Sequence, residues 1–222
     1  MRPGTLGIGM TSVRTRERLI DRLRQQGISN RQVLEAMREV PRHLFIDEAM
    51  AHHAYEDKAL PIGFNQTISQ PYTVARMLEA LLAHGTPEQV LEVGTGSGYQ
   101  TALLAELVPK VFTIERIRPL LLRARQRLRQ LGYRNVLSDH VDGHQGWPGG
   151  GEFGGIIVSA APATLPEALL AQLAAGGCMV TPVGRLQNQL LKRITRSSEG
   201  LLREETLERV LFVPLIPGAL SG

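Results

Sequence analysis

The chain has 222 residues, of which 43% are hydrophobic and 21% are charged, a balance that is typical of a globular protein and excludes collagen-like, coiled-coil and disordered chains. No apolar run approaches the ~20 residues that a membrane-spanning helix needs, so we expect no integral membrane protein. The formal net charge of +4 is too mild to indicate a nucleic-acid partner by itself.

The sequence before residue 73 predicts helices followed by a long loop. Residues 1–11 show no periodicity, and we expect them to be irregular. Capping and stop signals then predict three segments: a helix from the cap Ser12 to Gln26, a helix from the cap Ser29 to the residue before Pro41, and a short helix within 43–53. The stretch 55–72 is long for a loop in a compact domain and carries several hydroxyl and amide side chains, which makes it a candidate functional segment.

A helix from Pro71 to the stop signal Gly85 precedes an alternation of strands and helices. The predicted elements are, in order, strand 90–93, helix 98–107, strand 111–114, helix 118–131, strand 136–137, strand 155–158, helix 166–173 and strand 178–183. Such alternation indicates right-handed βαβ crossovers and a parallel sheet covered on both faces. The apolar stretches 190–195 and 207–215 flank a turn-like segment without a helix, so they predict an antiparallel pair at the sheet edge.

The predicted fold class is therefore α/β, with a mostly parallel, doubly wound sheet, an antiparallel C-terminal strand pair and an N-terminal helical extension. Residues 1–72 would form the extension and the candidate loop, and residues 73–222 the sheet domain, in one compact unit. Because no further apolar stripe remains once the helices pack on the sheet, we expect a monomer. The first residues show no secretory leader, so the expected location is the cytoplasm.

The strongest local signal is the stretch 90–99, which reads VLEVGTGSGY. Its glycines Gly94, Gly96 and Gly98 follow a predicted strand and precede a predicted helix, so the backbone can turn sharply and approach a ligand at a helix N-terminus. The spacing is neither the dinucleotide fingerprint nor a phosphate P-loop. With Glu92 before the first glycine, the pattern favours a nucleotide-like ligand over a turn that only packs a helix on a strand.

Carboxylates follow the next two predicted strands. Glu115 ends the strand after the glycine motif, where a carboxylate can accept hydrogen bonds from ribose hydroxyls in the crevice of an open sheet, although a surface ion pair is the alternative. Asp142 and Gly143 follow the third strand, where the Asp can receive an adenine amino group and the Gly lets the backbone approach the ring. The sequence therefore predicts a nucleoside site at this edge of the sheet.

Three other features have structural interpretations. Four side chains near one strand end are of types that bind metals, but adjacent strand residues point to opposite faces, so we expect no metal site: Asp139, His140, Asp142 and His144. Cys178 is the only cysteine, which excludes an intrachain disulfide, and its apolar surroundings predict a core residue. The arginines within 116–134 alternate with leucines without interleaved aromatic residues, which favours a solvated helix face over a nucleic-acid patch.

Taken with the glycine motif, several further stretches make the sequence resemble the protein-L-isoaspartate (D-aspartate) O-methyltransferases of bacteria over nearly the whole chain. The stretches that carry the resemblance are QVL at 32–34, VPR at 40–42, ALPIG at 59–63, QTISQPY at 66–72, VLEVGTGSGYQT at 90–101, DG at 142–143, QGW at 145–147, IIVSAAP at 156–162, PVG at 182–184, LKR at 191–193 and FVPL at 212–215. The combination of TISQP with EVGTGSGY is much more specific than either motif alone. The resemblance implies a Rossmann-like methyltransferase fold.

The resemblance also implies a cofactor, a substrate and a set of site residues. The cofactor is S-adenosyl-L-methionine, with S-adenosyl-L-homocysteine as product, and the substrate is an isoaspartyl (or D-aspartyl) residue in a damaged protein or peptide, whose methyl ester closes to a succinimide and so initiates repair. Ser69 is then the active-site hydroxyl; an N-cap of the helix that begins near Pro71 is its alternative role, and both roles can hold at once. The implied substrate-binding residues are Ile62, Thr67, Ile68, Val183 and Gly184. The implied cofactor-binding residues are Thr67, Glu92, Gly94, Gly96, Gly98, Glu115, Asp142 and Gly143.

Two departures from the family pattern and two rival functions accompany this hypothesis. Val141 stands where the family usually has the first glycine of Gly-Asp-Gly, and Gly154-Gly155 follows Phe153 where the family usually has an Asp. One rival is a methyltransferase that acts on RNA or on a small-molecule carboxylate, but the segment 159–162 after the fourth strand offers small residues rather than the aromatic platform that a nucleobase needs. The other is a non-catalytic domain that only binds S-adenosylmethionine. We therefore expect isoaspartyl proteins, and neither nucleic acid nor membrane, as partners.

Overall fold

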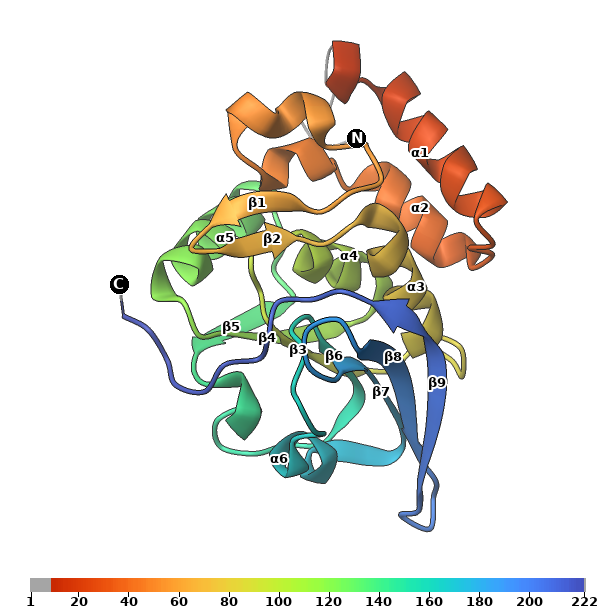
Figure 1. The fold of residues 1–222 in the computed structure, drawn as a ribbon, viewed down its shortest axis with the longest axis vertical. Helices are drawn as coiled ribbons and strands as arrows, with labels where there is room; N and C mark the ends of the chain where they lie inside the picture. The colour runs from red at the N-terminus through yellow and green to blue at the C-terminus, as the bar shows by residue number, and fades with distance from the viewer. Residues whose placement is uncertain (1–8, 222) are drawn as a thin grey trace.

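The computed structural model describes residues 9–221 and places seven strands in one sheet, in the order β5-β4-β3-β6-β7-β8-β9 (Figure 1). The first five strands in the chain order of this sheet run parallel: β3 (Gln89–Val93), β4 (Lys110–Glu115), β5 (Val136–His140), β6 (Phe153–Val158) and β7 (Leu173–Val183). The last two are antiparallel and form the edge: β8 (Gln189–Arg196) and β9 (Leu202–Val210). The strand order reverses at β3, which pairs with both β4 and β6, as the sequence predicts for a doubly wound fold.

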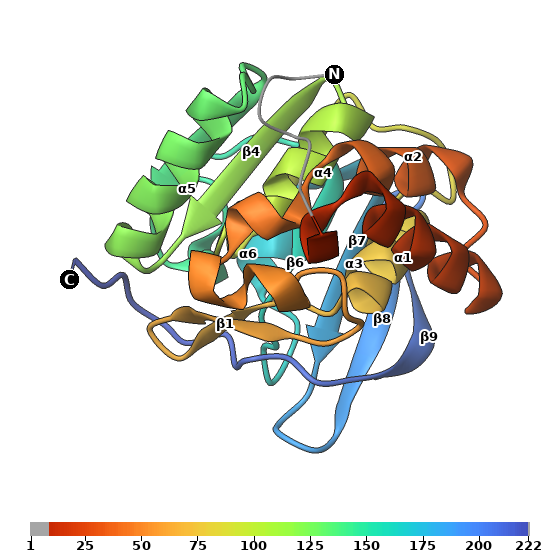
Figure 2. The same cartoon turned by 90° about the horizontal axis from the view of Figure 1, so that it is seen from above.

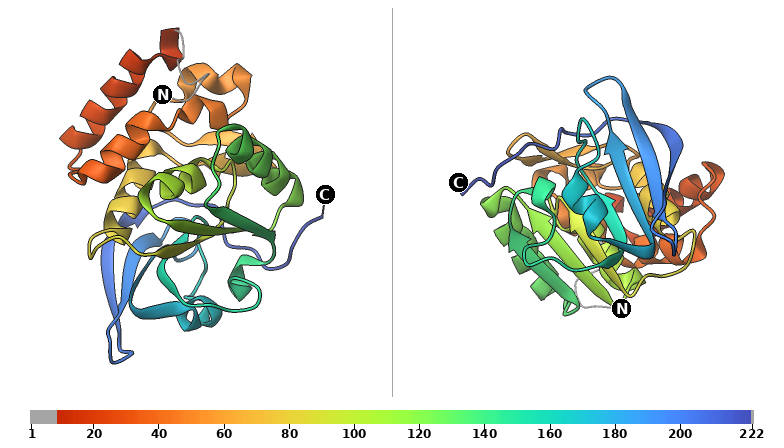
Figure 3. Two further views of the ribbon diagram at one scale, coloured as in Figure 1. Left: turned by 180° about the vertical axis from the view of Figure 1, so that it is seen from behind. Right: turned by 90° about the horizontal axis from the view of Figure 1, so that it is seen from below.

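Helices cover both faces of the sheet because alternate strand residues are apolar on both sides. On one face α3 (Pro71–Leu81), α4 (Tyr99–Leu107) and α5 (Arg118–Gln130) lie side by side (Figure 2), and Val90 of β3 packs beneath them. On the other face lies the short α6 (Glu167–Ala171), next to the 3-10 turn η4 (Gly143–Gln145), as the views from behind and below show (Figure 3). Leu91 and Val93 point to that side.

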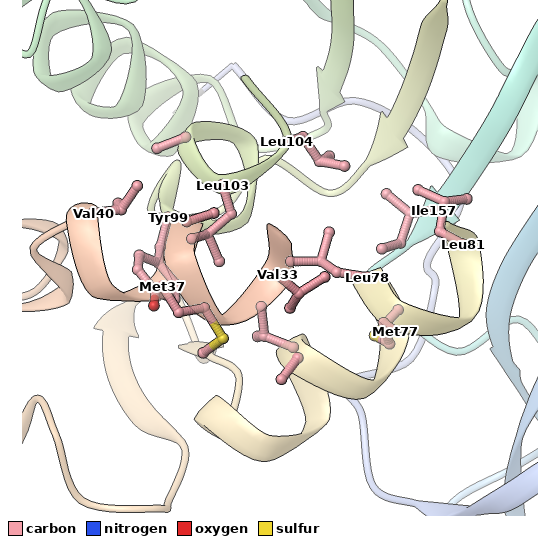
Figure 4. Close-up of a cluster of buried hydrophobic side chains, with 14 of the residues drawn as sticks. Val33, Met37, Val40, Met77, Leu78, Leu81, Tyr99, Leu103, Leu104 and Ile157 are labelled. Carbon is pink, nitrogen blue, oxygen red and sulfur yellow. The ribbon is translucent and has the colours of Figure 1, made fainter. Parts of the chain in front are cut away.

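The N-terminal extension packs on α3 and α4. It consists of η1 (Gly9–Thr11), α1 (Val13–Gln25), α2 (Arg31–Glu39), η2 (Arg42–Phe45), η3 (Glu48–His53) and a hairpin of β1 (Leu60–Gly63) and β2 (Gln66–Ile68). Its apolar side chains join those of the sheet domain in one cluster that runs from α2 through α3 and α4 to Ile157 of β6 (Figure 4). We therefore propose that extension and sheet domain form a single folding unit.

The structure corrects several predicted element boundaries. Ser12 caps α1 as expected, but Asn30 rather than Ser29 caps α2, because Asn30 Oδ1 accepts from Val33 N while Ser29 donates to Glu79. The expected short helix within 43–53 is replaced by the two 3-10 helices η2 and η3, with Ile46 and Asp47 between them. Residues 1–8 of the expected irregular start lie outside the described residues, and Gly9–Thr11 form a 3-10 turn.

The expected irregular loop 55–72 contains the β1–β2 hairpin. Its two turn residues, Phe64 and Asn65, both have positive φ, which is the backbone of a two-residue hairpin turn. Phe-Asn is not one of the glycine-containing pairs that usually mark this turn, so the sequence did not indicate it. Near the C-terminus, α6 ends at Ala171 and β7 begins at Leu173, whereas β9 ends at Val210, short of the predicted 215.

Within residues 9–221, no helix is both long enough and apolar enough to span a bilayer.

The shared apolar cluster generates a prediction about cooperativity. Met37 is 1% exposed where α2 packs on the other helices, so Met37→Ala should lower the free energy of unfolding by about 2–5 kcal/mol through loss of packing and the cavity left behind. Trp147 packs with Phe112 of β4 in the apolar cluster on the opposite face of the sheet. If the chain is one unit, the thermal unfolding transitions followed by far-UV circular dichroism and by Trp147 fluorescence should therefore shift together. Leu122→Ala, at a 52% exposed position, is the control. An unshifted fluorescence transition beside an earlier loss of helix signal would instead indicate two units.

Candidate functional site

A cavity of about 840 Å³, including its open mouth, lies at the carboxyl ends of β3, β4 and β6. This is the point where the strand order reverses, and open α/β sheets bind ligands at such a point. Its walls come from the residues after β3, β4 and β6, from the β2–α3 connection and from residues 213–216. We call residues 67–71 the TISQP loop. One cavity therefore brings together the glycine motif, Glu115 and the TISQP loop, which lie far apart in the sequence.

The glycine loop bends where the sequence predicts it. Gly94, Gly96 and Gly98 all have positive φ (97°, 53° and 86°), a conformation that residues with a Cβ rarely adopt. Gly94 and Gly96 line the cavity. Gly98 does not: it caps α4, and a Cβ on it would lie 3.2 Å from Ala124 Cβ, so its role here is close packing against α5.

Glu115 brings a carboxylate to the cavity at the end of β4. Its side chain is buried, and its two oxygens accept hydrogen bonds from Gly96 N and Ile117 N, each at 2.9 Å. Burial raises the pKa of Glu115 above its ordinary value, although these backbone donors act in the opposite direction. The hydrogen bond from Gly96 N joins the carboxylate to the glycine loop, so the two form one continuous wall of the cavity.

Glu92 lies beneath the cavity and does not line it. The side chain is 0% exposed, and Oε2 accepts from the hydroxyls of Thr101 and Thr113. Thr113 is also 2.6 Å from the hydroxyl of Thr95 in the glycine loop. This buried network links the loop, α4 and β4, so the structure gives Glu92 a supporting position where the sequence predicts a cofactor contact.

The sequence predicts that Asp142 and Gly143 both contact the cofactor, but only one of them lines the cavity. Gly143 lines the cavity, and a Cβ on it would lie 2.6 Å from Val93 Cγ1, so only glycine fits. Asp142 does not line the cavity; its carboxylate accepts from His144 N and, at 2.7 Å, from Gly218 N. Burial works against ionisation of Asp142, but these donors outweigh it and leave the pKa below its ordinary value.

The contact with Gly218 belongs to a C-terminal strap, residues 211–220, that crosses the carboxyl edge of the sheet from β9 toward β4 (Figure 1). Ala161 N donates to Val213 O and Leu215 N to Ala161 O, both at 2.8 Å. Nearer the C-terminus, Leu220 forms an isolated parallel β-bridge with Ile117, which follows β4. Pro214, Leu215 and Ile216 thereby form part of the cavity wall.

The β1–β2 hairpin carries the TISQP loop into the opposite wall. Thr67, Ile68 and Ser69 line the cavity. The N-cap of α3 is Gln70, with no side-chain hydrogen bond, so the alternative that Ser69 serves as that cap is wrong. The Ser69 hydroxyl is therefore not committed to the helix terminus.

Arg42 holds this loop in place, and sequence reasoning missed it. Its side chain is 0% exposed; Nε donates to Ala54 O at 2.9 Å and Nη2 to Ser69 O at 2.7 Å. The guanidinium lies 4.9 Å from the ring centroid of Tyr99, a residue of the cavity wall. Burial lowers the pKa of Arg42 to about 10. In the sequence, Arg42 stands out only as part of the VPR stretch at 40–42 of the family resemblance, which by itself assigns it no role.

A second cavity, of about 1190 Å³ with its open mouth, adjoins the first between the TISQP loop and β9. Four residues line both cavities: Thr67, Ser69, Ser159 and Val213. We call this set the junction. Of its members, Ser159 and Val213 were not among the predicted site residues.

Three of the predicted substrate-binding residues lie elsewhere. Ile62 packs on the outer side of the glycine loop, where a Cβ on Gly96 would meet it at 3.5 Å. Val183 and Gly184 line neither cavity, and Gly184 N donates to Pro162 O at 2.9 Å. In the part of the chain that the structure describes, no three His, Cys, Asp or Glu side chains are grouped to hold a metal ion.

Comparisons with known proteins find a matching family model, close relatives and similar solved structures. The family model described as Protein-L-isoaspartate(D-aspartate) O-methyltransferase matches residues 14–219. The chain is 58% identical to protein-L-isoaspartate O-methyltransferase 1 of Marinobacter nauticus, covering 96% of this chain and 97% of the relative. It is also 58% identical to the Cellvibrio japonicus protein of the same family name, covering 96% of each chain. A crystal structure from Plasmodium falciparum, described as a protein-L-isoaspartate O-methyltransferase in complex with S-adenosyl-L-homocysteine, has a TM-score of 0.81 and 27% identity over 90% of this chain and 98% of that one.

The buried Glu92 predicts a pH-dependent stability. Burial raises its pKa from 4.5 to about 7, so the folded chain holds a proton that the unfolded chain releases, and the resulting stability is full below pH 4.5 and is lost as pH rises through about 7. Glu92→Gln mimics the protonated form at every pH. Relative to wild type, it should therefore gain stability between pH 4 and pH 8, by up to about 3 kcal/mol. Urea unfolding at several pH values measures the gain, with the exposed Glu88→Gln as control. A difference between Glu92→Gln and wild type that stays constant over this range would contradict the prediction.

Proposed function

The chain belongs to the protein-L-isoaspartate (D-aspartate) O-methyltransferase family, and from this premise we propose how its own residues carry out the family reaction. The reaction is the S-adenosyl-L-methionine-dependent methylation of the free α-carboxylate of L-isoaspartyl residues, which starts the repair of damaged proteins through a succinimide. The observation that carries the residue assignments is the junction, because a cofactor in one cavity and a peptide in the other can meet only there.

The first cavity suits the cofactor in both shape and chemistry. Glu115 offers buried carboxylate oxygens to ribose hydroxyls, and Gly94, Gly96 and Gly143 let the backbone approach a flat, polar ligand. When bound, S-adenosyl-L-methionine supplies a methyl group on a positively charged sulfur. We assign the supporting network of Glu92 and the packing of Gly98 to the shape of this cavity, and the hydrogen bond from Gly218 to Asp142 to the attachment of the strap.

The substrate needs no base from the protein. An α-carboxyl group has an ordinary pKa of ~3.5 and is already ionised at neutral pH. In keeping with this, the described wall of the first cavity contains neither histidine nor lysine. What the residues of the junction contribute is orientation: the Ser69 hydroxyl and the backbone N–H groups of the TISQP loop hold the carboxylate toward the first cavity.

Exclusion of water is the second contribution. A carboxylate and a sulfonium lose their opposite charges as they react, so water stabilises the separated ions more than the transition state. The strap and the β1–β2 hairpin cover the carboxyl edge of the sheet from two sides, and both contribute to the wall of the first cavity. Arg42, through the Ser69 carbonyl, keeps the hairpin side fixed.

We also propose that the second cavity takes the peptide and that the chain acts in the cytoplasm as a monomer without a nucleic-acid partner. The end of β6 carries Ser159 and Ala160, which leave room for a peptide backbone but provide no platform for a base. Sedimentation at assay concentration measures the oligomeric state, and a dimer would overturn that part of the proposal.

Matched peptides test the substrate. Two hexapeptides that differ only in an isoaspartyl or a normal aspartyl linkage present equally nucleophilic carboxylates at different positions along the backbone. Because a displacement of about 1 Å can cost ~100-fold in rate, methyl incorporation into the isoaspartyl peptide should exceed that into the aspartyl peptide by about that factor. Comparable rates on both peptides, or preferred methylation of a tRNA or small carboxylic acid, would defeat the isoaspartyl assignment.

Two variants should separate cofactor binding from methyl transfer. Glu115→Ala removes charge-assisted hydrogen bonds, so calorimetric titration should show S-adenosyl-L-homocysteine binding about tenfold to hundredfold weaker. Ser69→Ala should leave that affinity unchanged and lower methyl transfer at least tenfold. Glu199→Ala, at an exposed turn position, is the control, and thermal melting shows whether each variant is folded. If Ser69→Ala retains full activity, or if Glu115→Ala binds normally, the corresponding assignment is wrong.

A further inference from the structure

Ser159 is the member of the junction that belongs to the sheet itself. It follows β6 directly, and its backbone N–H donates to Val93 O at 2.8 Å, which continues the pairing of β6 with β3. A Cβ on Gly94 would lie 3.4 Å from Ser159 Cβ, so the glycine loop passes close beside it. Ser159 is therefore fixed by the sheet at the boundary between the two cavities, whereas Ser69 reaches the same boundary from the hairpin side.

A glutamine sets the direction of the Ser159 hydroxyl. Gln100, near the start of α4 and only 8% exposed, donates from Nε2 to Ser159 Oγ at 2.7 Å. In this bond the Gln100 amide nitrogen is the donor and Ser159 Oγ is the acceptor.

This direction leaves the hydroxyl proton of Ser159 available. A serine hydroxyl carries one proton to donate, and the bond from Gln100 uses only the oxygen. Among the hydrogen bonds of residues 9–221, none uses that proton. The group of Ser159 that remains to bind a ligand is therefore a hydrogen-bond donor. A donor at the junction suits the substrate carboxylate of the proposed function, which is an anion.

We propose that the Ser159 hydroxyl is a second donor to the reacting carboxylate of the substrate, with Gln100 as the positioning residue that orients it. The proposal rests on the proposed function and extends it to residues outside the TISQP loop. One donor from the hairpin fixes a carboxylate at a single point, about which it can still rotate. A second donor from the sheet, directed at the oxygen that does not attack, fixes the carboxylate plane and leaves the other oxygen free to take the methyl group.

The test compares Ser159→Ala, the hydroxyl-retaining Ser159→Thr, Gln100→Met and the Ser159→Ala/Gln100→Met double variant. For each, kcat and KM are measured with the isoaspartyl hexapeptide, and S-adenosyl-L-homocysteine affinity is measured by calorimetry. Ser159→Ala should lower kcat/KM for the peptide about tenfold to hundredfold, the range for a lost hydrogen bond to a charged group, with the calorimetric affinity unchanged. Ser159→Thr should stay within about threefold of wild type because it keeps the donor.

The double variant tests the positioning role. If Gln100 acts through Ser159, Gln100→Met should lower kcat/KM alone but add nothing to Ser159→Ala. Ser138→Ala, whose hydroxyl lies on β5 outside both cavities, is the matched control.

The outcomes separate this inference from the proposed function. A wild-type chain that does not methylate the isoaspartyl peptide overturns the proposed function itself. An active wild type with an equally active Ser159→Ala overturns only the role of Ser159. A parallel loss of S-adenosyl-L-homocysteine affinity would make Ser159 a cofactor contact instead, and additive losses in the double variant would overturn the positioning role of Gln100.

Discussion

The buried guanidinium of Arg42 is the interaction on which the substrate side of the site depends. A fully buried charge is costly unless it is hydrogen-bonded, and Arg42 donates from Nε to Ala54 O and from Nη2 to Ser69 O, whereas its buried Nη1 has no partner among the described residues. The same group lies over Tyr99 at the start of α4. One side chain thus joins the N-terminal extension, the TISQP loop and the sheet domain, and its removal would leave buried carbonyls without partners.

A second buried network supports the cofactor side. Glu92, under the glycine loop, connects Thr101 of α4 with Thr113 of β4, and burial rather than any neighbouring charge is the main cause of its raised pKa. The strap is attached to this side through Asp142 and Ala161. The cavity therefore lies between two walls that are each held by buried hydrogen bonds, which suits a reaction that depends on alignment and exclusion of water rather than on proton transfer.

Much of the fold follows from local patterns. The strands and helices from Gln89 to Gln130 lie within a residue or two of their predicted bounds, because apolar runs, glycine stops and the glycine motif are all local signals. The misses lie where the local signal is ambiguous or absent. Ser29 and Asn30 are both good caps, and the choice fell to Asn30 because Glu79, distant in sequence, binds Ser29. The β1–β2 hairpin was missed because its turn residues, Phe64 and Asn65, lack the usual glycine.

The sequence by itself determined the fold class, the family and the two motifs that meet at the cavity, since glycine spacing and strand-end carboxylates are properties of short segments. Only the tertiary structure decided which of these residues face the cavity. Glu92 and Asp142 lie in motif positions, but their carboxylates accept hydrogen bonds from Thr101 and Gly218 and do not line the cavity, and Gly98 packs closely against Ala124. Conversely, Arg42, Gln100 and Ser159 reach the site through hydrogen bonds to residues 27 or more positions away in the chain, and no local pattern encodes a partner at that separation.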